Sequence, residues 1–192
     1  MEENEFLSLP PDLPVPEDDG AADHLTGIEM PSVRLPATDG SIIALGNLPA
    51  RCSLLFCYPR MARPGEPPFT ADWDRIPGAR GCTPEACGFR DHHLAFRAEG
   101  AAVFGISAQT PAEQREAAAR LRLPYPLLAD EGLELGEALR LPTMTVEGTL
   151  LLKRLTMAVE DGVVRRVWYP VFPPDRHAEE VLAWLRSRRN NS

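Results

Sequence analysis

Apolar residues gather in short runs that are separated by segments with helical features. The runs at 52–58, 101–107 and 124–130 show little alternation of apolar and polar positions, as expected for strands buried on both faces of a sheet. Between them, residues 83–96 and 110–122 each begin with favourable helix-starting residues. This alternation predicts an α/β domain whose central sheet is mixed, mostly parallel and flanked by helices.

Turn residues predict a hairpin on either side of this core. Asp39-Gly40 separates two short apolar segments within residues 32–45, a pattern typical of an N-terminal antiparallel hairpin. Residues 150–159 predict a strand that returns through a turn as a second strand at 163–169. Residues 175–189 then carry apolar side chains at helical spacing, which predicts an amphipathic helix that covers the sheet.

A single domain of ordinary size accounts for most of the 192 residues. Residues 1–27 are acidic and proline-rich, so we expect a flexible leader that buries too little apolar surface to offset its ordering entropy. The folded domain is expected over residues 28–190. Within it, residues 59–80 are rich in Pro and Gly, and so long a loop is usually functional or an insertion. We call residues 59–80 the inserted loop.

Charge and composition argue against several functional classes. The net charge is −8, and residues 1–24 hold eight of the 28 acidic residues without any Lys or Arg. The remainder is formally neutral and has no basic stripe, which argues against nucleic acid as a partner. No apolar run approaches the roughly 18 residues of a membrane span. The N-terminus is acidic where a signal peptide is basic, and the cysteines are irregularly spaced, so we expect a cytoplasmic protein.

Two of the four cysteines are expected to be structural. Cys52 and Cys57 lie in the apolar run at 52–58, where they would point to opposite faces of a strand, roughly 16 Å apart. They cannot bond to each other and are expected to pack in the core. Their spacing is also poor for a metal compared with knuckle-type pairs, so no metal site is expected.

The other pair, Cys82 and Cys87, lies at a predicted helix start. Thr83 is a favourable N-cap, Pro84 suits the first helical position and Glu85 suits the first turn. Backbone N–H groups and the helix dipole at this end stabilise a thiolate, which makes Cys82 the better nucleophile. Cys87, five residues later, is too far round an intact helix for a disulfide. A bond between them therefore requires the first turn to unwind.

This arrangement favours one order of events. Cys82 can react alone and be trapped by Cys87 afterwards, which is the order that reduction of a peroxide requires. The alternative is that both cysteines are structural and pack as small apolar side chains.

The segment Cys-Thr-Pro-Glu-Ala-Cys-Gly-Phe-Arg-Asp at 82–91 closely resembles the active-site segment of the Q-type, or bacterioferritin comigratory protein-like, peroxiredoxins. The resemblance implies a thioredoxin-like fold and an antioxidant enzyme with a peroxidatic Cys82 and a resolving Cys87. It also implies hydrogen peroxide or an organic hydroperoxide as substrate and thioredoxin or a similar dithiol protein as reductant. No metal, haem or flavin is implied, and such a protein would be a monomer or a homodimer.

Two further places carry the resemblance. Pro59 follows a buried strand as the family's proline does, and Arg154, before Leu155 and Thr156, matches the family's Arg-x-Ser/Thr segment. The permanently charged guanidinium of Arg154 would stabilise the thiolate and orient a peroxide oxygen. The resemblance therefore implies three catalytic residues and three substrate-binding residues. The catalytic ones are Cys82, Cys87 and Arg154, and the substrate-binding ones are Pro59, Thr83 and Glu85.

The inserted loop departs from the family motif Pro-x3-Thr/Ser-x2-Cys. Counting back from Cys82 places Ala79 and Arg75 at the two motif positions. Either Thr70 or Thr83 supplies the missing hydroxyl, or backbone N–H groups near Cys82 bind the substrate alone.

Three other functions stay open from the sequence. A protein thiol-disulfide oxidoreductase also uses two cysteines, although it normally needs partners that close without unwinding. A redoxin-like binding module without catalysis would be consistent with the loss of the motif threonine. A redox sensor could use the acidic leader to contact a partner.

Overall fold

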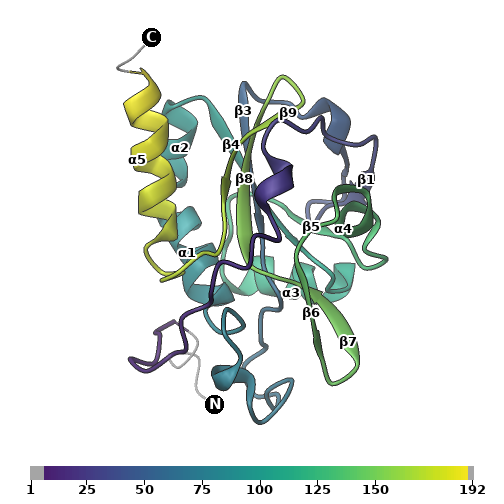
Figure 1. The fold of residues 1–192 in the computed structure, drawn as a ribbon, viewed down its shortest axis with the longest axis vertical. Coiled ribbons are helices and arrows are strands. Elements are labelled where there is room, and N and C mark those ends of the chain that lie inside the picture. Colours follow the sequence, from purple (N-terminus) through teal and green to yellow (C-terminus); the bar gives the residue numbers. More distant parts are fainter. Residues whose placement is uncertain (1–6, 190–192) are drawn as a thin grey trace.

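The computed structural model describes residues 7–189, and its centre is a five-stranded sheet with the order β5-β4-β3-β8-β9 (Figure 1). These strands are β3 (Cys52–Cys57), β4 (Ala101–Ser107), β5 (Leu127–Ala129), β8 (Leu155–Glu160) and β9 (Val163–Trp168). β3 is parallel to β4 and β4 to β5, whereas β8 is antiparallel to both β3 and β9. Four strands therefore point the same way and β8 opposes them, which confirms the predicted mixed, mostly parallel sheet.

Helices cover both faces of this sheet (Figure 1). The α-helices are α1 (Cys82–Asp91), α2 (His93–Ala98), α3 (Pro111–Arg120), α4 (Glu134–Leu139) and α5 (His177–Arg189). The 3-10 helices are η2 (Asp23–Leu25), η3 (Leu45–Asn47) and η4 (Trp73–Arg75). Residues of α1, α2, α3 and α5 pack in one hydrophobic cluster, and residues of α4 and of the N-terminal segment pack in the other.

The central strand β3 is buried on both faces, as its apolar run predicted. All six residues are buried, and successive side chains enter the two clusters in turn. Phe56 stacks on Phe89 of α1 with ring centroids 4.7 Å apart, whereas Leu55 packs in the cluster of α4. Cys52 and Cys57 are core residues in opposite clusters, as expected. The strand thus anchors α1, the helix that carries the other two cysteines.

Both predicted hairpins form, but the second differs from its prediction. β1 (Arg34–Pro36) and β2 (Ile42–Ala44) pair antiparallel, which confirms the N-terminal hairpin. The predicted strand at 150–159 is instead two strands, because β7 (Thr149–Leu152) pairs with β6 (Thr143–Val146) outside the main sheet. Lys153 and Arg154 lie in the break before β8. Arg154 is therefore not a strand residue.

The helix with the two cysteines begins two residues earlier than predicted. Its N-cap is Gly81, in the left-handed conformation (φ 107°) and without a side-chain cap. Thr83 lies inside the first turn, so its prediction as N-cap was wrong. A Cβ at position 81 would lie 2.4 Å from Cγ of Pro174, so this close approach requires glycine. The predicted helix at 83–96 also divides into α1 and α2.

Two other predicted helices form. Thr110 is the N-cap of α3 and makes a capping box with Glu113; the helix ends at Arg120 rather than at residue 122. α5 covers the sheet as the spacing of its apolar residues predicted, with Val181 and Leu182 buried. Over residues 7–189, no helix is long and apolar enough to cross a bilayer.

The described part of the leader, residues 7–27, lies against the body of the domain. Leu25 is fully buried in the cluster of α4. The carboxylate of Asp19 accepts hydrogen bonds from Lys153 Nζ and from the Tyr169 hydroxyl, each at 2.7 Å. The division of the chain after residue 27 stays a prediction; residues 1–6 and 190–192 lie outside the described residues.

The inserted loop is held at its beginning and along its length. Gln109 accepts a hydrogen bond from Met61 N at 2.8 Å and donates one to Met61 O at 3.1 Å. Trp73 of η4 packs in a small cluster with Val146 and Leu151 of the β6–β7 hairpin. The loop therefore rests on this hairpin and leads into Cys82.

Candidate active site

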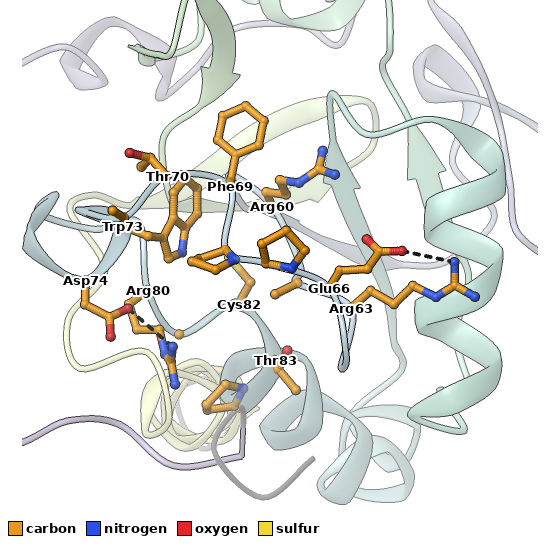
Figure 2. Close-up of a pocket in the computed structure, with 16 residues that line it drawn as sticks. Arg60, Arg63, Glu66, Phe69, Thr70, Trp73, Asp74, Arg80, Cys82 and Thr83 are labelled. Atoms are coloured by element: carbon orange, nitrogen blue, oxygen red, sulfur yellow. Dashed lines mark hydrogen bonds and ion pairs between the residues drawn. The ribbon is translucent and has the colours of Figure 1, made fainter. Parts of the chain in front are cut away.

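Cys82 is the first residue of α1 and lies in the wall of a pocket. The pocket has a volume of about 230 Å³ and is lined by the inserted loop and the first turn of α1 (Figure 2). The backbone N–H of Glu85 donates to Gly81 O at 3.0 Å and closes that first turn. Only 3% of Cys82 is exposed, and its Sγ donates to Ala79 O at 3.5 Å. The thiol is therefore almost entirely shielded from solvent, and Cys82 borders the pocket.

Arg154 contacts the sulfur and is not among the residues that line this pocket. Its Nη2 donates to Sγ of Cys82 at 3.2 Å. The same nitrogen donates to three consecutive carbonyls of the turn at residues 78–80, at 3.2–3.3 Å, and Nη1 donates to Glu85. Although Arg154 and Cys82 are 72 positions apart, the break between β7 and β8 brings the guanidinium to the helix start. One side chain therefore holds the loop, the helix and the thiol together.

The charges of Arg154, Glu85 and Cys82 influence one another. Burial raises the pKa of Glu85 to about 7, although contact with Arg154 lowers it. For Arg154, burial lowers the pKa, but Cys82 and Glu85 outweigh it and raise the pKa above its usual value. The guanidinium is therefore a permanent cation that faces two groups able to carry negative charge. A protonated Glu85 leaves more of that positive charge for a thiolate at Cys82.

Cys87 lies further along the same helix, and 7% of it is exposed. Burial raises the pKa of its thiol, so its protonated form predominates at neutral pH. Both cysteines are free thiols, and five helical residues separate them by about 7.5 Å along the axis and by more than a turn. Tyr125 donates its hydroxyl to Ala86 O at 2.7 Å, which holds the helix between them.

The three predicted substrate-binding residues occupy different places. Thr83 lines the pocket beside Cys82, as does Thr70 of the inserted loop (Figure 2). Pro59 is buried directly after β3 and is not among the pocket-lining residues. Glu85 turns toward Arg154 and does not line the pocket either. Contact of Pro59 or Glu85 with a substrate in this pocket is therefore not supported, and both are positioned behind the site.

The two motif positions that lack the family residues have different surroundings. Ala79 is fully buried, and its carbonyl accepts hydrogen bonds from Arg154 and from Cys82. Arg75 is exposed and pairs with Asp72 at 3.3 Å. The two threonines that line the pocket, Thr70 and Thr83, thus lie outside the motif spacing.

Sequence reasoning missed a buried histidine behind the site. His177 Nε2 lies 2.7 Å from Oγ1 of Thr156, and its ring makes an edge contact with Phe89 of α1 at 5.8 Å between centroids. Burial, with the charge of Arg154, lowers the pKa of His177 to about 3, so the ring is neutral. Thr156 was signalled by its place two residues after Arg154. No signal in the sequence pointed to the histidine, because only the fold brings α5 to β8.

The remaining cysteines have the properties of unreactive thiols. Burial raises the pKa of Cys52 to about 12 and raises that of Cys57 further. Among residues 7–189, no three His, Cys, Asp or Glu side chains gather as a metal site would require.

A thiol at a helix start, held against a guanidinium on a thioredoxin-like sheet, defines a thiol-dependent redox protein of the redoxin class. The Redoxin family model matches residues 25–182. By this match and by the relatives below, the chain belongs to the peroxiredoxin Q branch of the redoxin family.

Curated relatives are plant proteins of that branch. The chain is 30% identical to the chloroplastic peroxiredoxin Q of Gentiana triflora over 187 residues, which are 95% of this chain and 78% of that protein. It is 31% identical to the chloroplastic peroxiredoxin Q of Populus jackii over 157 residues, 82% of this chain. The chain spans 66% of the length of the Populus protein, so just under two thirds of it.

Solved structures share the fold. Peroxidoxin BcpB of Mycobacterium tuberculosis is 29% identical with a TM-score of 0.67, over 84% of this chain and 96% of that chain. Peroxiredoxin Q of Xanthomonas campestris is 21% identical with a TM-score of 0.65, over 92% of this chain and 98% of that chain, and shows the fold alone. The thioredoxin-like peroxiredoxin fold predicted from the sequence is thereby confirmed.

Proposed function

We propose that this protein is a thiol peroxidase in which Cys82 reduces a hydroperoxide and Cys87 resolves the product. The observation that carries the proposal is the 3.2 Å hydrogen bond from Arg154 Nη2 to Sγ of Cys82, a residue that lines a pocket. Membership in the peroxiredoxin Q branch supports the same activity.

The first step converts the Cys82 thiolate into a sulfenic acid. The sulfur attacks one oxygen of the hydroperoxide, an S–O bond forms and the O–O bond breaks. Sulfur loses two electrons, and the leaving oxygen takes up a proton and departs as water or as an alcohol. Arg154, whose Nη2 donates to Sγ of Cys82, stabilises the thiolate before the attack. Thr83 lines the pocket together with Cys82, and we take its hydroxyl as the candidate group that binds the substrate.

The second step forms a disulfide between Cys82 and Cys87. The Cys87 sulfur attacks the sulfenic sulfur, an S–S bond forms and water leaves. Because the helical separation exceeds what a disulfide permits, the first turn of α1 must unwind. The turn is held by the Arg154–Glu85 ion pair and by Tyr125, whose hydroxyl bonds to Ala86 O. The strength of these contacts should set how fast the sulfenic acid is resolved.

The disulfide is then reduced by thiol exchange with an external dithiol protein, for which thioredoxin is the family-implied candidate. Two electrons pass to the disulfide, and the donor leaves as its own disulfide. The cytoplasmic location, the reductant and the choice between monomer and homodimer stay predictions.

The activity is tested by following hydrogen peroxide consumption with thioredoxin as reductant, and by trapping sulfenic acid with dimedone after one equivalent of peroxide. Cys82→Ser should abolish both peroxide consumption and trapping. Cys87→Ser should lose turnover with thioredoxin but accumulate a trappable sulfenic acid at Cys82. Cys52→Ala is the matched control, because its thiol is buried in the core on β3 and should not contribute.

Other outcomes separate the remaining functions. A binding module would show no sulfenic acid in any variant. A protein thiol-disulfide oxidoreductase would reduce or oxidise a disulfide substrate faster than it consumes peroxide; the placement of both thiols on one intact helix argues against it. Either result would overturn the proposal.

A further inference from the structure

We propose that the inserted loop builds a binding site for the organic substituent of the hydroperoxide, with Phe69 and Trp73 as specificity-determining residues. This inference rests on the proposed function and names a substrate class for it: hydroperoxides with a bulky, uncharged, apolar group such as cumene hydroperoxide. The inserted loop, which departs from the family motif, would then serve to bind the substrate.

The pocket that Cys82 lines is larger than hydrogen peroxide requires. The pocket holds about 230 Å³, whereas a cavity of about 150 Å³ is enough for benzene and one water molecule takes about 30 Å³ of liquid volume. Hydrogen peroxide, with two heavy atoms, would leave most of the pocket empty. A phenyl ring with a branched carbon and a peroxide group fits the volume better. Because Cys82 itself lines the pocket, a substituent bound there lies next to the reactive residue.

Much of the pocket lining is aromatic or apolar. Two aromatic rings of the inserted loop, Phe69 and Trp73, make an edge contact at 5.9 Å between centroids and lie on the same side of the pocket (Figure 2). Proline rings and small apolar side chains complete much of the remaining lining. These are Pro67, Pro68, Pro84, Ala62 and Ala71. Such surfaces favour an apolar or aromatic ligand group.

The arginines at the pocket are already paired with carboxylates. Each of its three arginines contacts a carboxylate, so no excess of positive charge is offered to an anionic substituent. The pairs are Arg60–Glu113 at 2.5 Å, Arg63–Glu66 at 3.3 Å and Arg80–Asp74 at 3.3 Å. The guanidinium of Arg60 also lies 5.0 Å from the centre of the Phe69 ring, which orients that ring. An uncharged substituent is therefore favoured over a carboxylate-bearing one.

The apolar wall of the pocket, formed by Phe69 and Trp73, is already packed without a ligand. Trp73 is buried against Ala79, Val146 and Leu151, with Phe69 packed on the same cluster. The loop does not need to order around the ligand, so less entropy is lost on binding. A fixed wall can discriminate between substituents by shape.

The reaction in this site is the balanced step already described. The sulfur of Cys82 takes the terminal oxygen, the O–O bond breaks, and the substituted oxygen leaves with a proton as the alcohol. The aromatic part remains in the pocket until the alcohol dissociates.

The test measures kcat/KM for cumene hydroperoxide and for hydrogen peroxide in one set of variants, and reports the ratio of the two. Ala71→Phe fills the pocket and Phe69→Ala removes part of its wall, so each should lower the ratio about tenfold, mainly through KM, since one lost apolar group is worth roughly 10–200-fold. Asp72→Phe adds the same ring at a neighbouring exposed position that does not line the pocket. This control should leave the ratio unchanged.

Binding is measured separately from catalysis with the product alcohol, 2-phenyl-2-propanol, titrated into the Cys82→Ser protein. Tryptophan fluorescence should change with a saturable dependence on the alcohol, and the change should disappear in the Trp73→Phe, Cys82→Ser variant. A ratio that stays constant in both pocket variants, or an alcohol titration without a Trp73-dependent signal, overturns the inference while peroxide consumption persists. Failure of the proposed function is distinct, because then neither peroxide is consumed.

Discussion

The contact between Arg154 and Cys82 leads to a prediction whose magnitude follows from the structure. For unit charges 3.2 Å apart, Coulomb's law with an effective dielectric constant of about 20 gives roughly 5 kcal/mol. Glu85 shares the guanidinium, so only part of this energy is available to a thiolate. We expect removal of the guanidinium to lower the rate constant for oxidation of Cys82 about a hundredfold, which corresponds to about 2.7 kcal/mol.

The perturbation must avoid leaving Glu85 as an unpaired buried charge, which alone costs about 3–5 kcal/mol of stability. The informative comparison is therefore Glu85→Gln against the double variant Glu85→Gln, Arg154→Met. Glu85→Gln removes the competing carboxylate and should react at least as fast as the wild type. The double variant, in which a flexible apolar side chain fills the site, should be about a hundredfold slower than Glu85→Gln.

The assay is stopped-flow oxidation of the thiol by hydrogen peroxide, measured for each variant at the same neutral pH. Thermal unfolding confirms that each variant is folded. If the double variant reacts within threefold of Glu85→Gln, the electrostatic role of Arg154 is refuted.

Three other predictions test the frame around the site. Tyr125→Phe removes the 2.7 Å hydrogen bond to Ala86 O, so stability should fall by about 1 kcal/mol in urea unfolding and disulfide formation after peroxide should accelerate; slower resolution would contradict this. Gly81→Ala places a Cβ against Pro174 in a left-handed turn. The melting temperature and the rate of Cys82 oxidation should therefore both drop. Wild-type values of both would show that glycine is not required at this position. The pKa of His177 is lowered by burial to about 3, so the unfolded chain, with a pKa of about 6.5, binds the proton first. The contribution of His177 to stability is therefore full above pH 6.5 and falls as the pH drops toward 3, by at most about 1.4 kcal/mol per pH unit. In the His177→Gln variant, the free energy of unfolding should depend less steeply on pH over this range. Equal pH dependence in the variant and the wild type would contradict this.

Elements with strong local signals were predictable. The uninterrupted apolar run of β3 left no alternative to a strand buried on both faces, and Thr110-Pro111 specified the start of α3 because its cap depends on adjacent residues. The α1 start was misplaced because two local signals compete there. Thr83 has the preferred cap side chain, but Gly81 takes the left-handed turn that packs against Pro174, and this tertiary contact decides the outcome.

The break at Lys153 and Arg154 was not predictable from local patterns. Residues 150–159 form one continuous β-favouring run, but its first half pairs with β6 and its second half with β3 and β9. Only long-range pairing determines where one sheet ends and the other begins. The guanidinium reaches the thiol because of this break.

The site was predictable only in part for the same reason. Cys82, Cys87 and Arg154 could be singled out because the resemblance marks them, and the structure brings Arg154 and Cys82 together. The positions of Pro59 and Glu85 relative to the pocket depend on how the inserted loop folds, which no local signal specifies. His177 and the aromatic wall at Phe69 and Trp73 come from segments without a shared motif.

The most direct test of the central claim is to treat the reduced wild-type protein with one equivalent of hydrogen peroxide and to map its thiols by mass spectrometry. We expect a protein two hydrogen atoms lighter, with a single disulfide between Cys82 and Cys87 and with Cys52 and Cys57 still free. A protein that keeps all four thiols, or one oxidised first at Cys52 or Cys57, would contradict it.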